Sequence, residues 1–180
     1  MYGCDFIHES LARLFTLWFD YGSRVVTVTT PGGTGGGTKS SAEMVKCLAR
    51  MNDFVNKLTD KCPPYYFLVV LPQLASRICH AHTDVWKCLR RILVRTMTRF
   101  PQQAFWHMVA LSKSSYKTRS DRCKEIFDLV SATDAKLKKM ISDGLSLADR
   151  LHRLAEARLD IGTCSVDDAA PTLKRMLEDR

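Results

Sequence analysis

The chain has 180 residues, of which 46% are apolar and 26% are charged, which is the composition of a folded domain. This balance excludes a wholly disordered chain and a small scaffold held by disulfides. The net charge of +8 suits a nucleic-acid partner, an acidic protein surface, or a segment of something larger.

The first predicted element is an amphipathic helix over residues 5–21, and we expect Gly22 to end it. Its apolar positions recur at steps of three and four residues, which places them on one helix face. These positions are Ile7, Leu11, Leu14, Phe15, Trp18 and Phe19. Residues 1–22 therefore form the first helical unit.

Residues 23–41 differ from their surroundings in composition. The run from Val25 to Val28 favours a strand, and five glycines fall within residues 32–37. A segment so rich in glycine cannot bury enough side chain to order itself. The sequence therefore predicts a flexible Gly/Thr-rich loop over residues 23–41.

Helical spacing returns over residues 42–160. A 4-3-4-3 rhythm of apolar residues predicts a helix over 41–61, with Ser41 as its N-cap. Two prolines at residues 63 and 64 end this helix and open the next stretch, 65–81. Within that stretch Pro72 predicts a kink or a new helix start.

Three more helical stretches follow. The first covers 84–99, with Thr83 or Asp84 as its cap, and Pro101 opens the second, which covers 102–111. The third is a long stretch from about 118 to 160, in which Asp143 and Gly144 are a candidate interruption. Residues 161–180 are predicted to be a linker and a truncated helix.

Together these stretches give seven or eight helices joined by short turns. Each has an apolar stripe that needs a neighbour, and helical hairpins stacked in order meet this need. The predicted fold is therefore all-α, a fragment of a TPR/HEAT-like helical-repeat solenoid, although no strict sequence period is visible. We expect its two ends to expose apolar faces.

Five aromatic side chains are predicted to anchor the core of this stack. Each stabilises the fold by about 1.5–3 kcal/mol when fully buried. They are Trp18, Phe67, Trp86, Phe105 and Trp106.

The seven cysteines are an odd number, no CxxC pair occurs, and residues 1–20 lack the pattern of a signal peptide. The longest fully apolar run, Phe67 to Leu71, is too short to span a bilayer. We therefore expect a reducing compartment, no membrane partner, and cysteines used as small buried apolar residues.

The glycine tract invites comparison with a phosphate-binding loop. Gly32 and Gly37 have the required spacing, but Thr38 separates Gly37 from Lys39 and Ser40. This insertion displaces the lysine, and no parallel sheet is predicted around it. We therefore favour a flexible insert over a nucleotide site.

Two further patterns have simple structural interpretations. His80 and His82 lie near Cys79 and Cys88, but histidines two apart on a helix point about 200° apart, so a hydrogen-bonded helix end is favoured over a metal site. The segment 149–152, Asp-Arg-Leu-His, resembles part of a kinase catalytic loop but lies within a predicted amphipathic helix. We expect no catalytic, cofactor-binding or metal-binding residue in this chain.

Positive charge is concentrated in residues 87–124, which hold ten basic residues and one acidic residue. Such a block suits a phosphate backbone, an acidic partner, or an acidic part of the same parent protein. The candidate partner-facing surface consists of Arg91, Arg95, Arg99, Lys113, Lys117 and Arg119.

Three stretches resemble a known family. They are residues 14–22 (LFTLWFDYG), residues 73–82 (QLASRICHAH), and residues 101–126, which begin with PQQAFW. They resemble the C-terminal part of the FAT domain of ATR-type checkpoint kinases, which are phosphatidylinositol 3-kinase-related protein kinases. The resemblance is dense over residues 65–130, clear at 11–22, and fades after about 130.

The resemblance implies a helical scaffold that wraps a serine/threonine kinase domain and helps to set its activity in the nuclear DNA damage and replication-stress checkpoint. The motifs of the kinase domain are missing from this sequence, so catalysis, ATP and magnesium would belong to the parent protein. The implied partners are the kinase domain of the same parent and other subunits of an ATR-type complex. A free-standing basic module that binds nucleic acid is the alternative.

The resemblance also suggests a hypothesis about the 102–111 helix. This short helix and the turn after it would form a rigid edge that transmits strain toward the kinase, with Trp106 at its centre.

Overall fold

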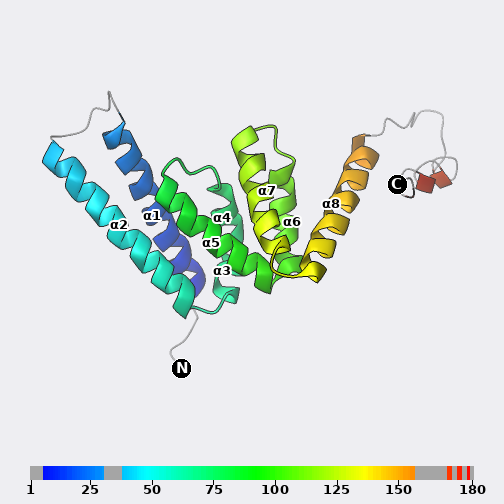
Figure 1. Ribbon diagram of the computed structural model, residues 1–180, viewed down its shortest axis with the longest axis horizontal. Helices are drawn as coiled ribbons and strands as arrows, with labels where there is room; N and C mark the ends of the chain where they lie inside the picture. Colours follow the sequence, from blue (N-terminus) through cyan, green and yellow to red (C-terminus); the bar gives the residue numbers. More distant parts are fainter. Residues whose placement is uncertain (1–5, 31–37, 157–169, 172–173, 176–177, 179–180) are drawn as a thin grey trace.

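The computed structural model describes residues 6–30, 38–156 and five residues near the C-terminus, 170–171, 174–175 and 178. Eight helices occur within the described residues 6–30 and 38–156, and no strand occurs among the described residues. They are α1 (Ile7–Thr29), α2 (Thr38–Lys61), α3 (Tyr65–Val69), α4 (Leu71–Ser76), α5 (Thr83–Arg99), α6 (Pro101–Ser112), α7 (Lys117–Ser131) and α8 (Ala135–Glu156). The helices stand side by side in a row from the α1–α2 pair to α8 (Figure 1). The predicted all-α fold of stacked helices is confirmed.

The core runs along the middle of this row. Helix α5 is its centre, because it packs against α2, α3, α4, α6 and α7. Four of the five predicted anchors are buried, namely Trp18, Phe67, Trp86 and Phe105. The fifth prediction is wrong, because Trp106 is 52% exposed. The buried face of α6 is a stripe that includes Phe105 and Val109, and Trp106 lies one residue beyond it.

Helix α1 is longer than predicted. It continues through Gly22 and the Val25–Val28 run to Thr29, so the predicted stop and the predicted strand are both wrong. The flexible-loop prediction is also wrong for residues 23–29 and 38–41, which are helical, while residues 31–37 lie outside the described residues. Burial of Val25 explains the difference, because tertiary packing overrides the weak helix propensity of β-branched residues.

The proline predictions are confirmed. Pro64 is the N-cap of α3, and Pro72 lies in the first turn of α4, after a break at Val70. The predicted N-caps of the longer helices are wrong. Helix α2 begins at Thr38, before Ser41, and α5 is capped by His82, whose Nδ1 accepts a hydrogen bond of 3.2 Å from the backbone N–H of Asp84.

The predicted single stretch over 118–160 is two helices. Residues 132–134 separate them, and the Asp134 carboxylate accepts a hydrogen bond of 2.8 Å from the backbone N–H of Lys136 at the start of α8. Helix α8 runs without a break through Asp143 and Gly144. Residues 161–180 are predicted to be a linker and a truncated helix; of these, 161–169 lie outside the described residues, and the described residues 170–171, 174–175 and 178 are helical.

A hydrogen-bonded cluster joins α1, the segment between α4 and α5, and α7. The ring of the buried His80 donates from Nε2 to the carbonyl of Phe19 (3.0 Å), and its Nδ1 accepts from the backbone N–H of His82 (3.1 Å). Arg122 of α7 donates to the carbonyls of Ile78 (2.7 Å) and His80 (2.9 Å). We call this set the His80 cluster.

The burial of His80 also predicts how the stability of the fold depends on pH. Desolvation lowers the pKa of His80 below its usual value of 6.5, and the nearby charges of His82 and Arg77 lower this pKa further. The unfolded chain therefore takes up this proton first as the pH falls. The contribution of His80 to the free energy of unfolding should therefore be fully present above about pH 6.5. It should be lost as the pH falls through the folded-state pKa of this residue.

Urea unfolding at pH 7.5 and at pH 5.5 measures this effect. His80→Gln should lower the stability at pH 7.5 and reduce its pH dependence. His107→Gln, at an exposed position of α6, is the matched histidine control and should leave the stability at pH 7.5 unchanged.

Candidate functional site

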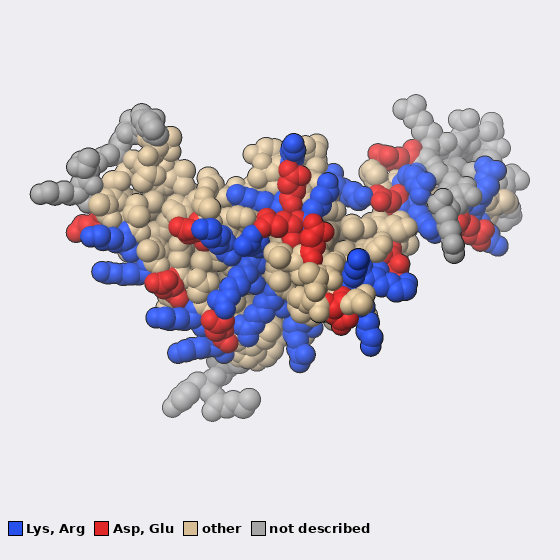
Figure 2. Space-filling model, in the orientation of Figure 1, with Lys and Arg blue, Asp and Glu red and all other residues tan. Residues whose placement is uncertain are grey.

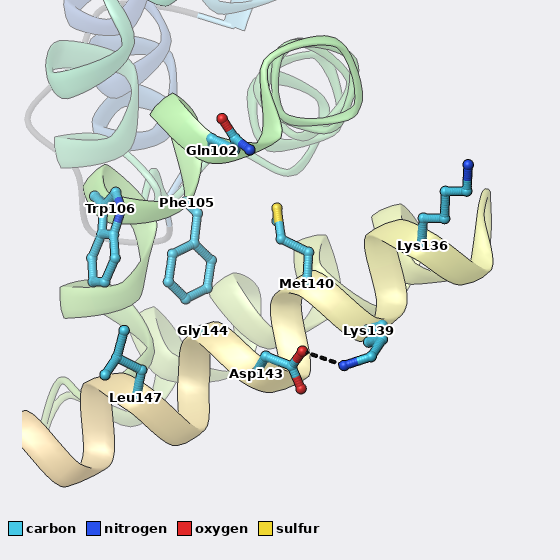
Figure 3. A pocket seen from close by; sticks show the side chains of 9 residues that line it. All are labelled: Gln102, Phe105, Trp106, Lys136, Lys139, Met140, Asp143, Gly144 and Leu147. Carbon is cyan, nitrogen blue, oxygen red and sulfur yellow. Dashed lines mark hydrogen bonds and ion pairs between the residues drawn. The ribbon is translucent and has the colours of Figure 1, made fainter. Parts of the chain in front are cut away.

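A groove with a volume of about 520 Å³ lies between α6 and α8. We call it the α6–α8 groove, and Figure 3 shows its lining from close by. Its lining residues are Gln102, Phe105, Trp106, Lys136, Lys139, Met140, Asp143, Gly144 and Leu147.

A glycine makes the floor of this groove. A Cβ atom at Gly144 would lie 2.6 Å from Cζ of Phe105, so only a glycine lets this ring pack directly on the backbone of α8. The Phe105 ring meets Trp106 edge-on, with 5.2 Å between ring centroids, and stacks on Phe127. Trp106 and Leu147 lie opposite one another across the groove (Figure 3).

The charges around the groove are few. Lys139 forms an ion pair of 2.6 Å with Asp143, while Lys136 makes no ion pair with any described residue. The single carboxylate in the lining is thus already paired, and the lining holds no nucleophile beside a base. An apolar groove of this kind suits the binding of another helix or of large apolar side chains.

The close contact at Gly144 gives a stability prediction. Gly144→Ala should lower the free energy of unfolding by about 1–3 kcal/mol, because the new methyl group must displace the packed Phe105 ring. At an open helix position the same change stabilises by about 1 kcal/mol. Ser142→Ala, at an exposed position of the same helix, is the control, and urea unfolding measures both. Equal stabilisation by both substitutions would contradict this account.

A second apolar surface lies at the other end of the row, between α1 and α2. It comprises two adjoining hollows of about 480 and 220 Å³ that share Leu14, Met51 and Phe54. We call it the α1–α2 surface. Arg13, Leu17, Cys47 and Arg50 also line it. The exposed Cys47 departs from the expectation of buried cysteines, whereas Cys88 and Cys123 are buried.

An exposed apolar face at an end of the stack is expected from the sequence, but the residues that form this surface were not identified. The α2 stripe was predicted from its 4-3-4-3 rhythm, and Phe54 lies one residue before the buried Val55 of that stripe. A large aromatic residue beside a regular stripe marks a candidate for such a surface, although the sequence does not tell whether a neighbour covers that residue.

The six predicted basic residues do not form one free surface. Arg91 pairs with Asp60 of α2 at 2.6 Å, Arg95 donates to the backbone carbonyl of Asp60, and Lys113 pairs with Asp149 of α8. On the face of the molecule that Figure 2 draws, Asp and Glu side chains are interspersed among the Lys and Arg side chains.

The remaining three, Arg99, Lys117 and Arg119, make no ion pair with a described residue, and Arg99 and Lys117 are exposed. Three of these six residues thus link separate segments within the fold. A shared partner-facing role for all six stays a prediction.

The other sequence patterns are also placed by the structure. His80 and His82 are hydrogen-bonded at the segment that leads into α5, and no group of three or more metal-ligating residues occurs in the described part of the chain. Residues 149–152 lie on α8, while Gly32 and Gly37 fall outside the described residues. No described helix is long and apolar enough to cross a membrane.

Comparison with known proteins identifies the family. Residues 50–148 match the family model described as "Serine/threonine-protein kinase ATR-like, HEAT repeats", which is a model of helical repeats and not of a kinase domain. The matching relatives include protein kinase rad3 of Schizosaccharomyces pombe, at 29% identity over 88% of this chain and 7% of the relative. They also include two proteins called serine/threonine-protein kinase ATR. That of Arabidopsis thaliana is 36% identical over 67% of this chain and 4% of the relative, and that of Drosophila melanogaster is 29% identical over 89% and 6%.

The chain therefore spans between 4% and 7% of the length of these relatives. No solved structure matches it significantly. Since the family model covers more than half of the chain and the structure is a row of stacked helices, the chain belongs to the HEAT-repeat segments of ATR-like serine/threonine-protein kinases.

Proposed function

We propose that this chain is a non-catalytic helical scaffold segment of an ATR-type checkpoint kinase, and that it packs on the kinase domain and regulates it. The observation that supports this most directly is the apolar surface at each end of the helix row. A repeat array buries such faces against its neighbours. The α1–α2 surface and the α6–α8 groove are therefore the places where adjoining parts of a larger protein would pack.

The position of this chain within the parent kinase is also part of the proposal. The resemblance of residues 65–130 points to the FAT region, next to the kinase domain, whereas the matching family model describes HEAT repeats. We propose the FAT-side position, with the kinase domain of the parent as the main partner and other subunits of the complex as further partners. ATP and magnesium would bind to that kinase domain, and the location would be nuclear.

The experiment uses the full-length parent kinase with Trp106→Ala. Trp106 is half exposed on the α6–α8 groove, so its loss should change activation of the kinase more than it changes the stability of this segment. Leu129→Ala, at an exposed apolar position of α7 outside the groove lining, is the control and should change neither. Unchanged kinase activation by Trp106→Ala, with unchanged stability, would contradict the proposed regulatory contact.

The alternative is a basic module that binds nucleic acid. Arg99 and Lys117 favour it, because both are exposed and neither forms an ion pair with a described residue. Binding to single-stranded DNA that weakens steeply between 50 and 200 mM salt would support it. This function is the weaker candidate, because Arg91 and Lys113 form ion pairs within the fold.

A further inference from the structure

We propose that the α1–α2 surface binds an amphipathic helix with acidic residues along the edges of its apolar stripe, and that another part of the parent protein supplies this helix. The source of the helix rests on the proposed function, whereas its chemistry follows from the surface itself.

The shape of the surface suits a helix. Helices α1 and α2 lie side by side and run in opposite directions (Figure 1). Leu14 and Leu17 form a ridge on α1, and Met51 and Phe54 form a ridge on α2, each pair spaced three residues apart. A third helix can lay its own ridge between two such ridges. Leu17 and Phe54 are 58% and 55% exposed, so both are available for contact.

The charges of the surface specify the sign of its partner. Arg13 on α1 and Arg50 on α2 line the two hollows, and no acidic residue lines either of them. Neither arginine makes an ion pair with a described residue, although Glu9 and Asp53 lie on the same two helices. Arginine stems cover apolar surface while their guanidinium groups stay free to pair with carboxylates. An apolar stripe with acidic edges is the complement of this arrangement.

The same charges disfavour a second copy of this chain as the occupant. The α6–α8 groove is the other large apolar surface described, and its lining holds two lysines and one carboxylate that already pairs with Lys139. Head-to-tail stacking of two copies would set Arg13 and Arg50 against a basic groove. Contact between two α1–α2 surfaces would set arginine against arginine.

A helix of the same polypeptide is the source that the comparisons favour. The relatives are 14 or more times longer than the part that this chain matches, since that part is at most 7% of their length. A helix tethered in the same polypeptide binds at a high effective concentration, so a surface with modest affinity is occupied.

The first experiment tests whether the 180-residue chain prefers a helix with acidic edges, and it uses designed peptides. One helical peptide carries leucines on one face with glutamates on both edges, and its control has lysine in place of every glutamate. Fluorescence anisotropy of the labelled peptides should show the glutamate peptide binding at least about tenfold more tightly at low salt, a difference that added salt reduces. The double variant Arg13→Glu, Arg50→Glu should reverse this order.

Variants of the apolar ridges complete this test. Phe54→Ala should weaken binding of the glutamate peptide by about tenfold or more, because exposed aromatic anchors dominate such interfaces. Trp106→Ala alters the other groove and should leave the affinity unchanged. Equal binding of both peptides, or equal effects of the two aromatic substitutions, would overturn the proposal. Thermal unfolding of each variant confirms that the fold is retained.

The second experiment tests whether the bound helix comes from the same polypeptide, and it measures the alkylation of a cysteine on the α1–α2 surface. Cys47 is exposed and lines the α1–α2 surface, so the helix should shield it from alkylation in the full-length parent but not in the 180-residue chain. The half-buried Cys62 and Cys79 serve as references. Equal reactivity of Cys47 in both proteins would overturn the intramolecular source. Neither readout depends on kinase activity, so both remain informative if the regulatory proposal fails.

Discussion

Arg122→Ala is expected to lower the free energy of unfolding by about 2–4 kcal/mol. The guanidinium group donates hydrogen bonds to the carbonyls of Ile78 and His80, and it lies 4.5 Å from the ring centroid of Trp86. Loss of the donor leaves two carbonyls without this partner, at about 1–3 kcal/mol for each group that stays buried. Loss of the cation–π contact adds about 0.5–1 kcal/mol. Urea unfolding at pH 7.5 measures the change.

Two other substitutions on α7 test the cause. Lys124→Ala removes an exposed cation from the same helix and should change stability by no more than about 0.5 kcal/mol. Arg122→Lys keeps the charge but loses the planar group that stacks on Trp86, so its loss should be intermediate. If Arg122→Ala and Lys124→Ala cost the same, the His80 cluster does not hold α7 to the α4–α5 segment.

The parts of the fold that the sequence predicted depend on local signals. The apolar rhythm of residues 44–58 and the prolines at 64, 72 and 101 locate α2, α3, α4 and α6 to within a few residues. Such signals act within one or two helical turns, so they are readable without knowledge of the neighbours. The break before α8 has a local signal as well, since Asp134 is an ordinary N-cap residue.

The parts that were missed depend on contacts between distant segments. Helix α1 passes through Gly22 and Val25 because both positions are buried, Gly22 against His80 and Val85. Helix α8 tolerates Gly144 because the Phe105 ring of α6 occupies the space of its missing side chain. Nothing in the residues next to these glycines distinguishes a helix end from a site of close packing.

The candidate surfaces also depend on contacts between distant segments. The sequence gives no measure of whether an aromatic residue beside an apolar stripe, such as Trp106 or Phe54, has a neighbour to cover it. Likewise, the charge of residues 87–124 could be counted, but Asp60 and Asp149 reach Arg91 and Lys113 only in the folded chain. Charge along a sequence therefore overestimated the free basic surface.

Gly22→Ala is expected to lower the free energy of unfolding by about 1–3 kcal/mol, although alanine is the better helix former by about 1 kcal/mol. The position lies within α1, where a new Cβ would stand 2.9 Å from Cε1 of His80 and 3.0 Å from Cγ2 of Val85. Both neighbours are buried, and the His80 ring is fixed by hydrogen bonds to Phe19 and His82. The ring cannot move aside without weakening these bonds, so the contact outweighs the gain in propensity.

A double-mutant cycle with His80→Ala identifies which neighbour resists the new methyl group. If the imidazole is the obstacle, Gly22→Ala should destabilise the His80→Ala background much less than it destabilises the natural sequence. Arg24→Ala, at an exposed position of α1, is the control and should not interact with His80→Ala. An unchanged loss in the His80→Ala background would assign the resistance to Val85 instead. If Gly22→Ala alone raises the stability, α1 does not pack closely on His80 and Val85. Only this close contact opposes the higher helix propensity of alanine.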